Sequence, residues 1–310
     1  MRDNFWLCCT SHRVTAPSSC GEQPELIPGP VVQSSTSAGP GISPTNSLET
    51  KPAGPVTVVR SLAPGLRRHR RGVHLARASS AKRLTSFKRL WYRIIKEKKI
   101  MNTKEALQIV GGLSKPSKMP GWSYGLPAKE CKTGGKLQKI PGSVCYNCYA
   151  LKGCYVFKVV QDAQYRRLNA IRSPLWVGAM ALLINSKKAN VFRWHDSGDI
   201  QDEEHLLKIF AVAKLTPKVK HWMPTREAWV KAFLPECPKN LIIRFSVPMV
   251  DQSKDKAPKG WRNTSTVSSD LNKTFTSEGH FCPAPKQNNE CGDCRACWDG
   301  RILNVVYGKH

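Results

Sequence analysis

The sequence predicts an α/β protein, built either as a partial (β/α) barrel or as an open parallel sheet. Short apolar runs that suit buried strands alternate with segments of helical periodicity between residues 155 and 247. Polar residues follow the strands expected at residues 190–195, 219–223 and 241–247. Because parallel strands end at one edge of a sheet, these polar residues mark the expected active-site edge.

The helices that connect these strands are expected from apolar periodicity. Ser173 and Pro174 suit the N-cap and the first turn of one of them. Residues 114–142 are rich in Gly and Lys and predict a loop. The expected helices cover residues 103–109, 155–171, 173–183, 206–213 and 227–233.

The first 100 residues differ in composition from the rest of the chain. They contain 17 Lys and Arg against 5 Asp and Glu, and they are rich in Pro, Ser and Arg, so residues 1–100 predict a disordered basic extension. Three interpretations stay open: an arm that binds nucleic acid, an organelle transit peptide, and a mis-called gene start. We favour the third, because Lys96–Ile100 is what a purine-rich ribosome-binding site before Met101 encodes when it is translated in frame.

The remaining residues are expected to form two parts. Residues 101–275 form the α/β domain with a first group of cysteines, and residues 276–310 form a Cys-rich appendage. The chain carries a formal net charge of +27, of which residues 101–310 keep +15. No apolar run approaches the roughly 18 residues that a membrane-spanning helix needs, and the first 30 residues lack a hydrophobic signal core. We therefore expect a cytoplasmic protein without a membrane partner.

Four cysteines near the C-terminus have the spacing of cluster ligands. Cys291, Cys294 and Cys297 are each separated by two residues, and Cys282 precedes a proline. Bacterial ferredoxins hold a [4Fe–4S] cluster with such a run and a remote Cys-Pro, because three thiolates on one tight turn bind three irons of the cube. A zinc ion prefers two separated pairs and is the alternative. Disulfides are disfavoured in a long chain without a secretory signal.

The first group of cysteines is less regular. Cys145 and Cys148 form a chelating pair, and Cys131 is expected to join them across the Gly-rich loop. Cys154 is either a fourth ligand or a buried thiol at the start of a helix. If only three thiolates bind a cluster, one iron keeps an open coordination position, and the cluster becomes a reactive site.

Two stretches of the chain resemble known families. Arg193–Asp199, followed by a helix and Trp222–Arg226, resembles the radical S-adenosylmethionine enzymes, in which a Gly-Gly-Glu turn after one strand precedes a helix and a strand. Cys145–Ala150, the Ser197–Asp199 turn and the Cys-rich tail together are more narrowly similar to the phage-encoded gene product 88 family. This second resemblance covers about residues 117–310 and implies a bacterial host or a phage-infected cell.

The resemblance to the radical enzymes implies S-adenosylmethionine as a cofactor, with Asp199 holding the amino group of the ligand. It implies cofactor-binding roles for Tyr149, Ser197, Gly198, Asp199, Thr225, Arg226, Arg244 and Ser246.

His195 and Asp199 are the candidate catalytic residues. The alternatives are a structural hydrogen-bonding role for His195 and helix capping for Asp199. Arg226 and Arg244 either bind a substrate phosphate or carboxylate, or pair with the nearby Asp residues.

The sequence thus predicts an iron–sulfur protein with one or two [4Fe–4S] clusters that carries out redox or radical chemistry on a small anionic molecule or nucleotide. A second cluster would relay electrons from a donor such as a flavodoxin or ferredoxin. The alternative is a non-catalytic zinc protein that binds nucleic acid through its basic surface.

Overall fold

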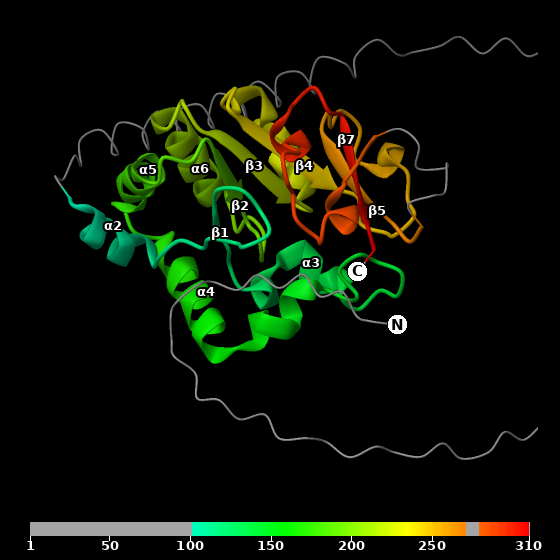
Figure 1. Ribbon diagram of the computed structural model, residues 1–310, viewed down its shortest axis with the longest axis horizontal. Coiled ribbons are helices and arrows are strands. Elements are labelled where there is room, and N and C mark those ends of the chain that lie inside the picture. The colour runs from blue at the N-terminus through cyan, green and yellow to red at the C-terminus, as the bar shows by residue number, and fades with distance from the viewer. Residues whose placement is uncertain (1–100, 271–278, 310) are drawn as a thin grey trace, which may run out of the picture. The chain divides into compact units, whose positions relative to one another are not determined.

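A computed structural model describes residues 101–270 and 279–309, and their fold is built around one seven-stranded parallel sheet (Figure 1). The strand order is β1-β2-β3-β4-β5-β7-β6. The predicted α/β class is therefore confirmed in its open form, because β6 and β1 lie at opposite edges and the sheet does not close into a barrel. The strands are β1 (Trp122–Tyr124), β2 (Val191–Trp194), β3 (Lys220–Thr225), β4 (Leu241–Ser246), β5 (Thr264–Ser268), β6 (His280–Phe281) and β7 (Asn304–Gly308).

Five α-helices accompany the sheet in the part of the chain that the structure describes. Four of them confirm expected helices, and α3 lies inside the segment expected to be a loop, as β1 does. The helices are α2 (Thr103–Val110), α3 (Lys132–Leu137), α4 (Lys158–Ala170), α5 (Trp176–Ser186) and α6 (Glu203–Leu215).

Two helical predictions need correction. The helix expected from Ser173 starts at Trp176, with Leu175 as its N-cap residue and no side chain capping it. The helix expected at 227–233 is a series of 3₁₀ turns, η4 (Ala228–Glu236), which contains Pro235. Proline has no N–H to donate, so it prevents a regular α-helical ladder in that segment.

The winding of the sheet places α5 and α6 on one face. Strands β1 to β5 have the same order in the sheet as in the sequence. Because each right-handed crossover then moves to the next strand in the same direction, the crossover helices lie on the same face of the sheet. Phe192 and Trp194 of β2, with Met223 of β3, belong to the core that also contains the buried residues of α5 and α6. We call this face the helix face. Figure 1 shows α5 and α6 together beside the strands.

The opposite face of the sheet is covered by the C-terminal segment. Val191 of β2 and Trp222 of β3 pack there against Trp298 of η8 (Ala296–Trp298). The Cys-rich region is thus joined to the sheet rather than set apart from it, since it also supplies β6 and β7. We call this face the cysteine face.

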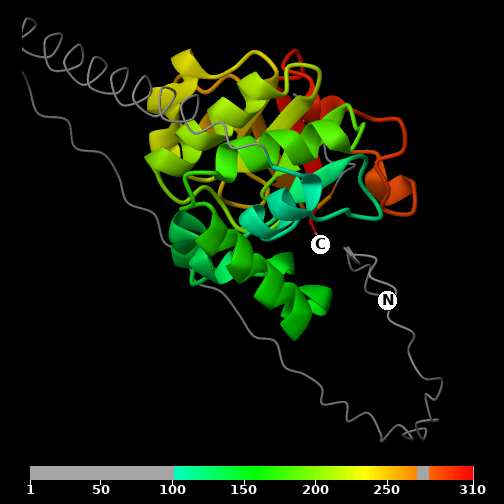
Figure 2. The ribbon, with the colours of Figure 1, turned by 90° about the vertical axis from the view of Figure 1, so that its left-hand side faces the viewer.

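The segment between β1 and α5 contains α3 and α4, which lie together to one side of the body that holds the sheet (Figure 2). It also contains three 3₁₀ turns: η1 (Ala128–Glu130), η2 (Tyr149–Leu151) and η3 (Gly153–Val156). Among the described residues, no helix is both long and apolar enough to cross a membrane.

Candidate metal centres

The first cysteine group lies on a loop that is fastened across the carboxyl ends of the strands. The side-chain amine of Lys132 donates a hydrogen bond to the carbonyl oxygen of Gln201 over 2.6 Å. One carboxylate oxygen of Glu227, just after β3, accepts the amide of Thr133 at 2.9 Å. Beyond β4, an antiparallel bridge joins Ser143 and Met249. The loop therefore sits at the edge where parallel sheets place their active sites.

Three thiols of this loop come together. Cys131 is the N-cap residue of α3, and a Cβ atom added to Gly134 would lie 3.6 Å from the Sγ of Cys131 and 3.7 Å from the Sγ of Cys145. Burial raises the pKa of Cys131 well above its usual range, and the negative charges of Asp199, Cys148 and Cys145 raise it further. Burial also raises the pKa of Cys148, and the negative charge of Cys145 raises it further. Cys131, Cys145 and Cys148 thus form one electrostatically coupled set, which we call the first thiol centre.

Cys154 lies in η3, after the turn that contains Tyr149, and it is half-buried. Its predicted role as a fourth ligand stays a prediction.

The turn after β2 has a structural role that the sequence did not reveal. The hydroxyl of Ser197 donates to the carbonyl oxygen of Leu126 over 2.8 Å and accepts from the side chain of Gln164 at 2.9 Å. Gly198 has a φ of +76°, and a Cβ there would lie 2.7 Å from the Cβ of Leu126. These residues fasten the turn to the chain that leaves β1, and only glycine fits the close approach.

Asp199 ties the ends of β2 and β3 together. Its Oδ1 accepts the amide of Ile200 at 2.7 Å, and its Oδ2 accepts the amide of Arg226 at 2.8 Å. Burial raises the pKa of Asp199 to about 6, although hydrogen bonds from Arg226 and Thr225 lower it. The helix cap considered for Asp199 is provided instead by Asp202, whose carboxylate accepts the amide of His205 at 2.8 Å.

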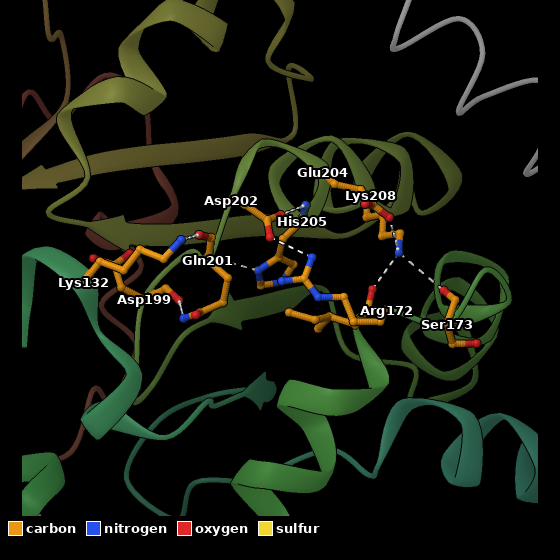
Figure 3. A network of polar contacts seen from close by, with 10 residues as sticks. Lys132, Arg172, Ser173, Asp199, Gln201, Asp202, Glu204, His205 and Lys208 are labelled. Atoms are coloured by element: carbon orange, nitrogen blue, oxygen red, sulfur yellow. Dashed lines mark hydrogen bonds and ion pairs between the residues drawn. The ribbon is translucent and has the colours of Figure 1, made fainter.

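A polar network connects this turn to Lys132, the residue that follows Cys131 in the chain (Figure 3). The carbonyl oxygen of Gln201 accepts the hydrogen bond from the side-chain amine of Lys132. The side-chain amide of Gln201 donates to the carbonyl oxygen of Asp199 over 2.8 Å. Asp202 also pairs with Arg172 at 2.7 Å. The network fixes the loop of Cys131 relative to α6, so the first thiol centre is held by rigid elements.

His195 is buried and has an unusual backbone conformation, with a φ of +55°. Its ring packs edge-on against His205, with 5.4 Å between the ring centroids, so it faces the helix face. Neither ring nitrogen has a hydrogen-bond partner in the protein. Burial lowers the pKa of His195 well below its usual range, and the ring is neutral at physiological pH.

Of the other predicted site residues, Tyr149, Thr225, Arg226 and Ser246 gather at the carboxyl ends of β2 to β4. The hydroxyl of Tyr149 donates to the carbonyl oxygen of Asp196 over 2.5 Å. Arg226 donates to the carbonyl oxygens of Ser246 and Val247, both at 2.9 Å.

The second cysteine group lies on the cysteine face. Cys282 follows β6, and its amide donates to the carbonyl oxygen of Val306 over 2.8 Å. Burial raises the pKa of Cys291 to about 11, and the charges of Cys282 and Cys294 add to the shift. Burial raises the pKa of Cys297 to about 12, with contributions from Cys282 and Cys291. These four thiols therefore surround one region, which we call the second thiol centre.

Two side chains make polar contacts with thiols of the second centre. The Nε2 atom of His280 lies 3.3 Å from the Sγ of Cys294. The hydroxyl of Tyr307 lies 3.1 Å from the Sγ of Cys297. The sequence did not single out these residues, because only the pairing of β6 with β7 brings them to the cysteines.

Arg244 does not have the anion-binding role that was considered for it. Its guanidinium is fully buried and donates five hydrogen bonds to carbonyl oxygens, so no N–H donor is left for a substrate phosphate or carboxylate. Among the described residues, the carboxylate that acts on its guanidinium is that of Asp299, not one of the Asp residues near Arg226. The acceptors are Cys297 at 3.1 Å, Thr264 at 3.3 Å, and Ile302, Ala296 and Asp299 at 2.9 Å.

Arg193, which was not expected to be a site residue, lies near both thiol centres. Its guanidinium lies 4.6 Å from the ring centroid of Trp222 and donates to the hydroxyl of Tyr149 over 3.3 Å. Its Nε has no partner, and its charge lowers the pKa of Cys291. A cation therefore stands between the loop of the first centre and the second centre.

Within residues 101–270 and 279–309, no three His, Cys, Asp or Glu side chains are arranged to hold a single metal ion. The same residues contain no disulfide among their nine cysteines.

The protein is an α/β protein with two candidate thiolate centres. Its open parallel sheet has helices on one face, and thiols gather at its carboxyl edge and on its other face. The chain belongs to the gene product 88 family, whose sequence pattern matches residues 93–300. This confirms the narrower of the two resemblances, and the resemblance to the radical S-adenosylmethionine enzymes stays a prediction. No curated protein and no solved structure matches the chain.

Proposed function

We propose that this protein binds iron–sulfur clusters at its two thiol centres and carries out redox chemistry on a small anionic molecule. One observation carries the proposal: Cys282, Cys291, Cys294 and Cys297 interact electrostatically with one another, although none of them forms a disulfide. Burial and mutual repulsion raise the pKa of Cys282, Cys291 and Cys297, so these three thiols stay protonated when no cation is present. A metal offsets that repulsion, because thiolates are the form that binds it.

The arrangement of the second centre favours a cluster over a single zinc ion. A single zinc ion prefers two separated pairs of thiolates, whereas Cys291, Cys294 and Cys297 are each separated by two residues and Cys282 stands apart from them. A cubane spreads its four thiolates over four irons, so its ligands stand further apart. Hydrogen bonds to the sulfur atoms tune the potential of such clusters, and His280 and Tyr307 are placed to provide them.

The first centre fits a cluster with an exposed corner. Cys131, Cys145 and Cys148 are three coupled thiols at the carboxyl edge of the sheet. Three thiolates leave one iron of a cubane without a protein ligand, and a small molecule can bind there. We propose S-adenosylmethionine as the first compound to test at this position, with Tyr149 and Arg226 nearby as polar contacts.

In this proposal Ser197 and Asp199 position a loop and do not bind the ligand. Their side-chain oxygens are already engaged by Leu126, Gln164, Ile200 and Arg226. We therefore assign them to positioning the loop that faces the centre. An electron donor such as a flavodoxin or ferredoxin would reduce the second centre.

The test is metal analysis of protein purified without oxygen, combined with electron paramagnetic resonance. The proposal predicts iron and acid-labile sulfide in equal amounts and a signal after reduction. A change of that signal on adding S-adenosylmethionine would support the open iron at the first centre. Stoichiometric zinc without iron would overturn the proposal and favour a zinc protein that binds nucleic acid, with affinity that falls steeply with salt.

A further inference from the structure

A cavity of about 500 Å³ lies at the amino-terminal ends of β2 and β3, beside the second thiol centre. Its wall includes Asn190 and Val191 at the start of β2, and Lys218 and Lys220 at the start of β3. This edge of the sheet is opposite the carboxyl ends that hold the first thiol centre. The cavity is thus separate from the site considered so far for a substrate.

One side of the cavity is apolar and rigid. Val191, Trp298 and Ile302 line it, and Val191 and Trp298 are buried against Trp222 in one packed cluster. The indole nitrogen of Trp298 donates to the carbonyl oxygen of Phe192 over 2.9 Å, which fixes the ring. Ligand sites of this size are mostly apolar, with a few polar groups that orient the ligand.

The other side of the cavity is positively charged. Lys218, Lys220 and Arg295 are exposed at the surface and line the cavity. Arg301 also lines it, but Arg301 pairs with Asp299 at 2.7 Å, so these two charges offset each other. Asp299 also acts electrostatically on Lys220, but the wall still has four Lys and Arg against one Asp. This excess of positive charge makes the cavity attractive to a polyanion.

We propose that this cavity binds a nucleoside phosphate, either free or at the end of a nucleic acid strand. The apolar wall suits a base or a sugar edge, and the cluster of Lys218, Lys220 and Arg295 suits the phosphates. A cavity volume of about 500 Å³ lies in the range of pockets that hold a nucleotide-sized ligand. The bound ligand would lie next to Cys294 and His280 of the second centre, which also line the cavity.

The inference does not depend on which metal the thiols bind, and its test measures binding alone. Isothermal titration calorimetry on the full chain compares ADP and ATP with adenosine and with inorganic pyrophosphate. Fluorescence anisotropy compares an oligothymidine that carries a 5′-phosphate with the same oligothymidine without it. Binding of free nucleotides assigns the site to small molecules, and binding of the phosphorylated strand alone assigns it to a strand end.

Three variants locate the site. The double variant K218E/K220E is expected to weaken nucleotide binding at least about tenfold, because it reverses two charges at the cavity. The control K104E/K256E makes the same change of net charge at exposed lysines outside the cavity wall and is expected to stay within about twofold. The variant N190W adds bulk at the cavity rim without changing the charge and is also expected to weaken binding.

Metal content and the melting temperature are measured for each variant, and only variants that match the parent in both are compared. The inference is overturned if no nucleotide or phosphorylated strand binds below about 1 mM. It is equally overturned if K218E/K220E binds as well as K104E/K256E, or if adenosine or pyrophosphate alone binds as tightly as ADP. None of these outcomes bears on whether the thiol centres hold iron.

Discussion

The guanidinium of Arg244, on β4, donates a hydrogen bond to the carbonyl oxygen of Cys297 over 3.1 Å. The same side chain holds the carbonyl oxygens of Ala296 and Asp299 on either side of that cysteine. A single buried arginine thus fastens the turn of the second thiol centre to the middle of the sheet.

Replacing Arg244 with Lys should destabilise the protein by about 2–4 kcal/mol, because an ammonium cannot satisfy five carbonyl oxygens in a fixed planar fork. Metal at the second centre should be lost as well. Arg226 is the matched control, since its guanidinium donates two hydrogen bonds, to the carbonyl oxygens of Ser246 and Val247, and R226K should cost less. Denaturant titration and metal analysis check both variants. Equal losses in the two would contradict the assigned role of Arg244.

The two glycines in α3 allow a test of the first centre. A valine at Gly134 would press on Cys131 and Cys145, whereas a Cβ at Gly135 would meet no atom within 4 Å apart from its chain neighbours and the backbone of its own helix. Both substitutions have similar effects on helix propensity, so their difference reports the contact with the thiols. G134V should contain about four fewer iron atoms per chain than G135V, and cluster analysis of the purified variants measures this. Identical iron content would show that Cys131 and Cys145 do not bind together.

Single cysteine variants should separate the two centres. C145S should lose the metal of the first centre alone, and C294S that of the second centre alone. Cys237 is the control, because its half-buried thiol donates to the carbonyl oxygens of Pro238 and Leu241 instead. C237S should keep all metal. If either of the first two variants loses all metal while still folded, the centres share one cluster.

The buried histidines predict that acid weakens the fold. Burial lowers the pKa of His205 and of His221 to about 3 and also lowers that of His195, whereas unfolded histidine titrates near 6.5. As the pH falls from about 6.5, the unfolded chain takes up protons that the folded chain does not, so the free energy of unfolding decreases. Asp199 has the opposite effect, because its pKa is raised to about 6 and the folded chain takes up its proton first between about pH 6 and pH 3.8. This one carboxyl group offsets only part of the effect of the three histidines.

The variant H205Q isolates one of these groups. It should reduce the slope of unfolding free energy against pH by about 1.4 kcal/mol per pH unit below pH 6. Urea titrations at several pH values from 4 to 7 measure both slopes. Parallel slopes in the parent and H205Q would mean that His205 is protonated in the folded state.

The longer elements of this fold were predictable because their signals are local. Helix α6 has an Asp N-cap, two acidic residues in its first turn and an apolar face, and β2 to β4 are apolar runs of ordinary length. Strands β5 and β6 were missed because Thr264–Ser268 is largely polar and His280–Phe281 has two residues. Their existence depends on pairing with β4 and β7, which no local pattern reports.

The cysteines of the candidate site were predictable from their spacing, but their surroundings were not. Glu227 and Tyr307 contact the thiol loops only through long-range packing. Arg244 was expected to bind an anion or pair with an Asp, and its carbonyl partners could not be foreseen, because they lie more than 50 residues away in four of its five hydrogen bonds. Ser197 and Asp199 likewise have their partners on other elements.

The central claim is that the two thiol centres hold iron–sulfur clusters. Protein purified without oxygen and analysed for iron, acid-labile sulfide and zinc, with electron paramagnetic resonance after reduction, tests it most directly. We predict roughly eight iron and eight sulfide per chain and the signal of a reduced [4Fe–4S] cluster. Stoichiometric zinc, with no iron and no signal, would contradict the account.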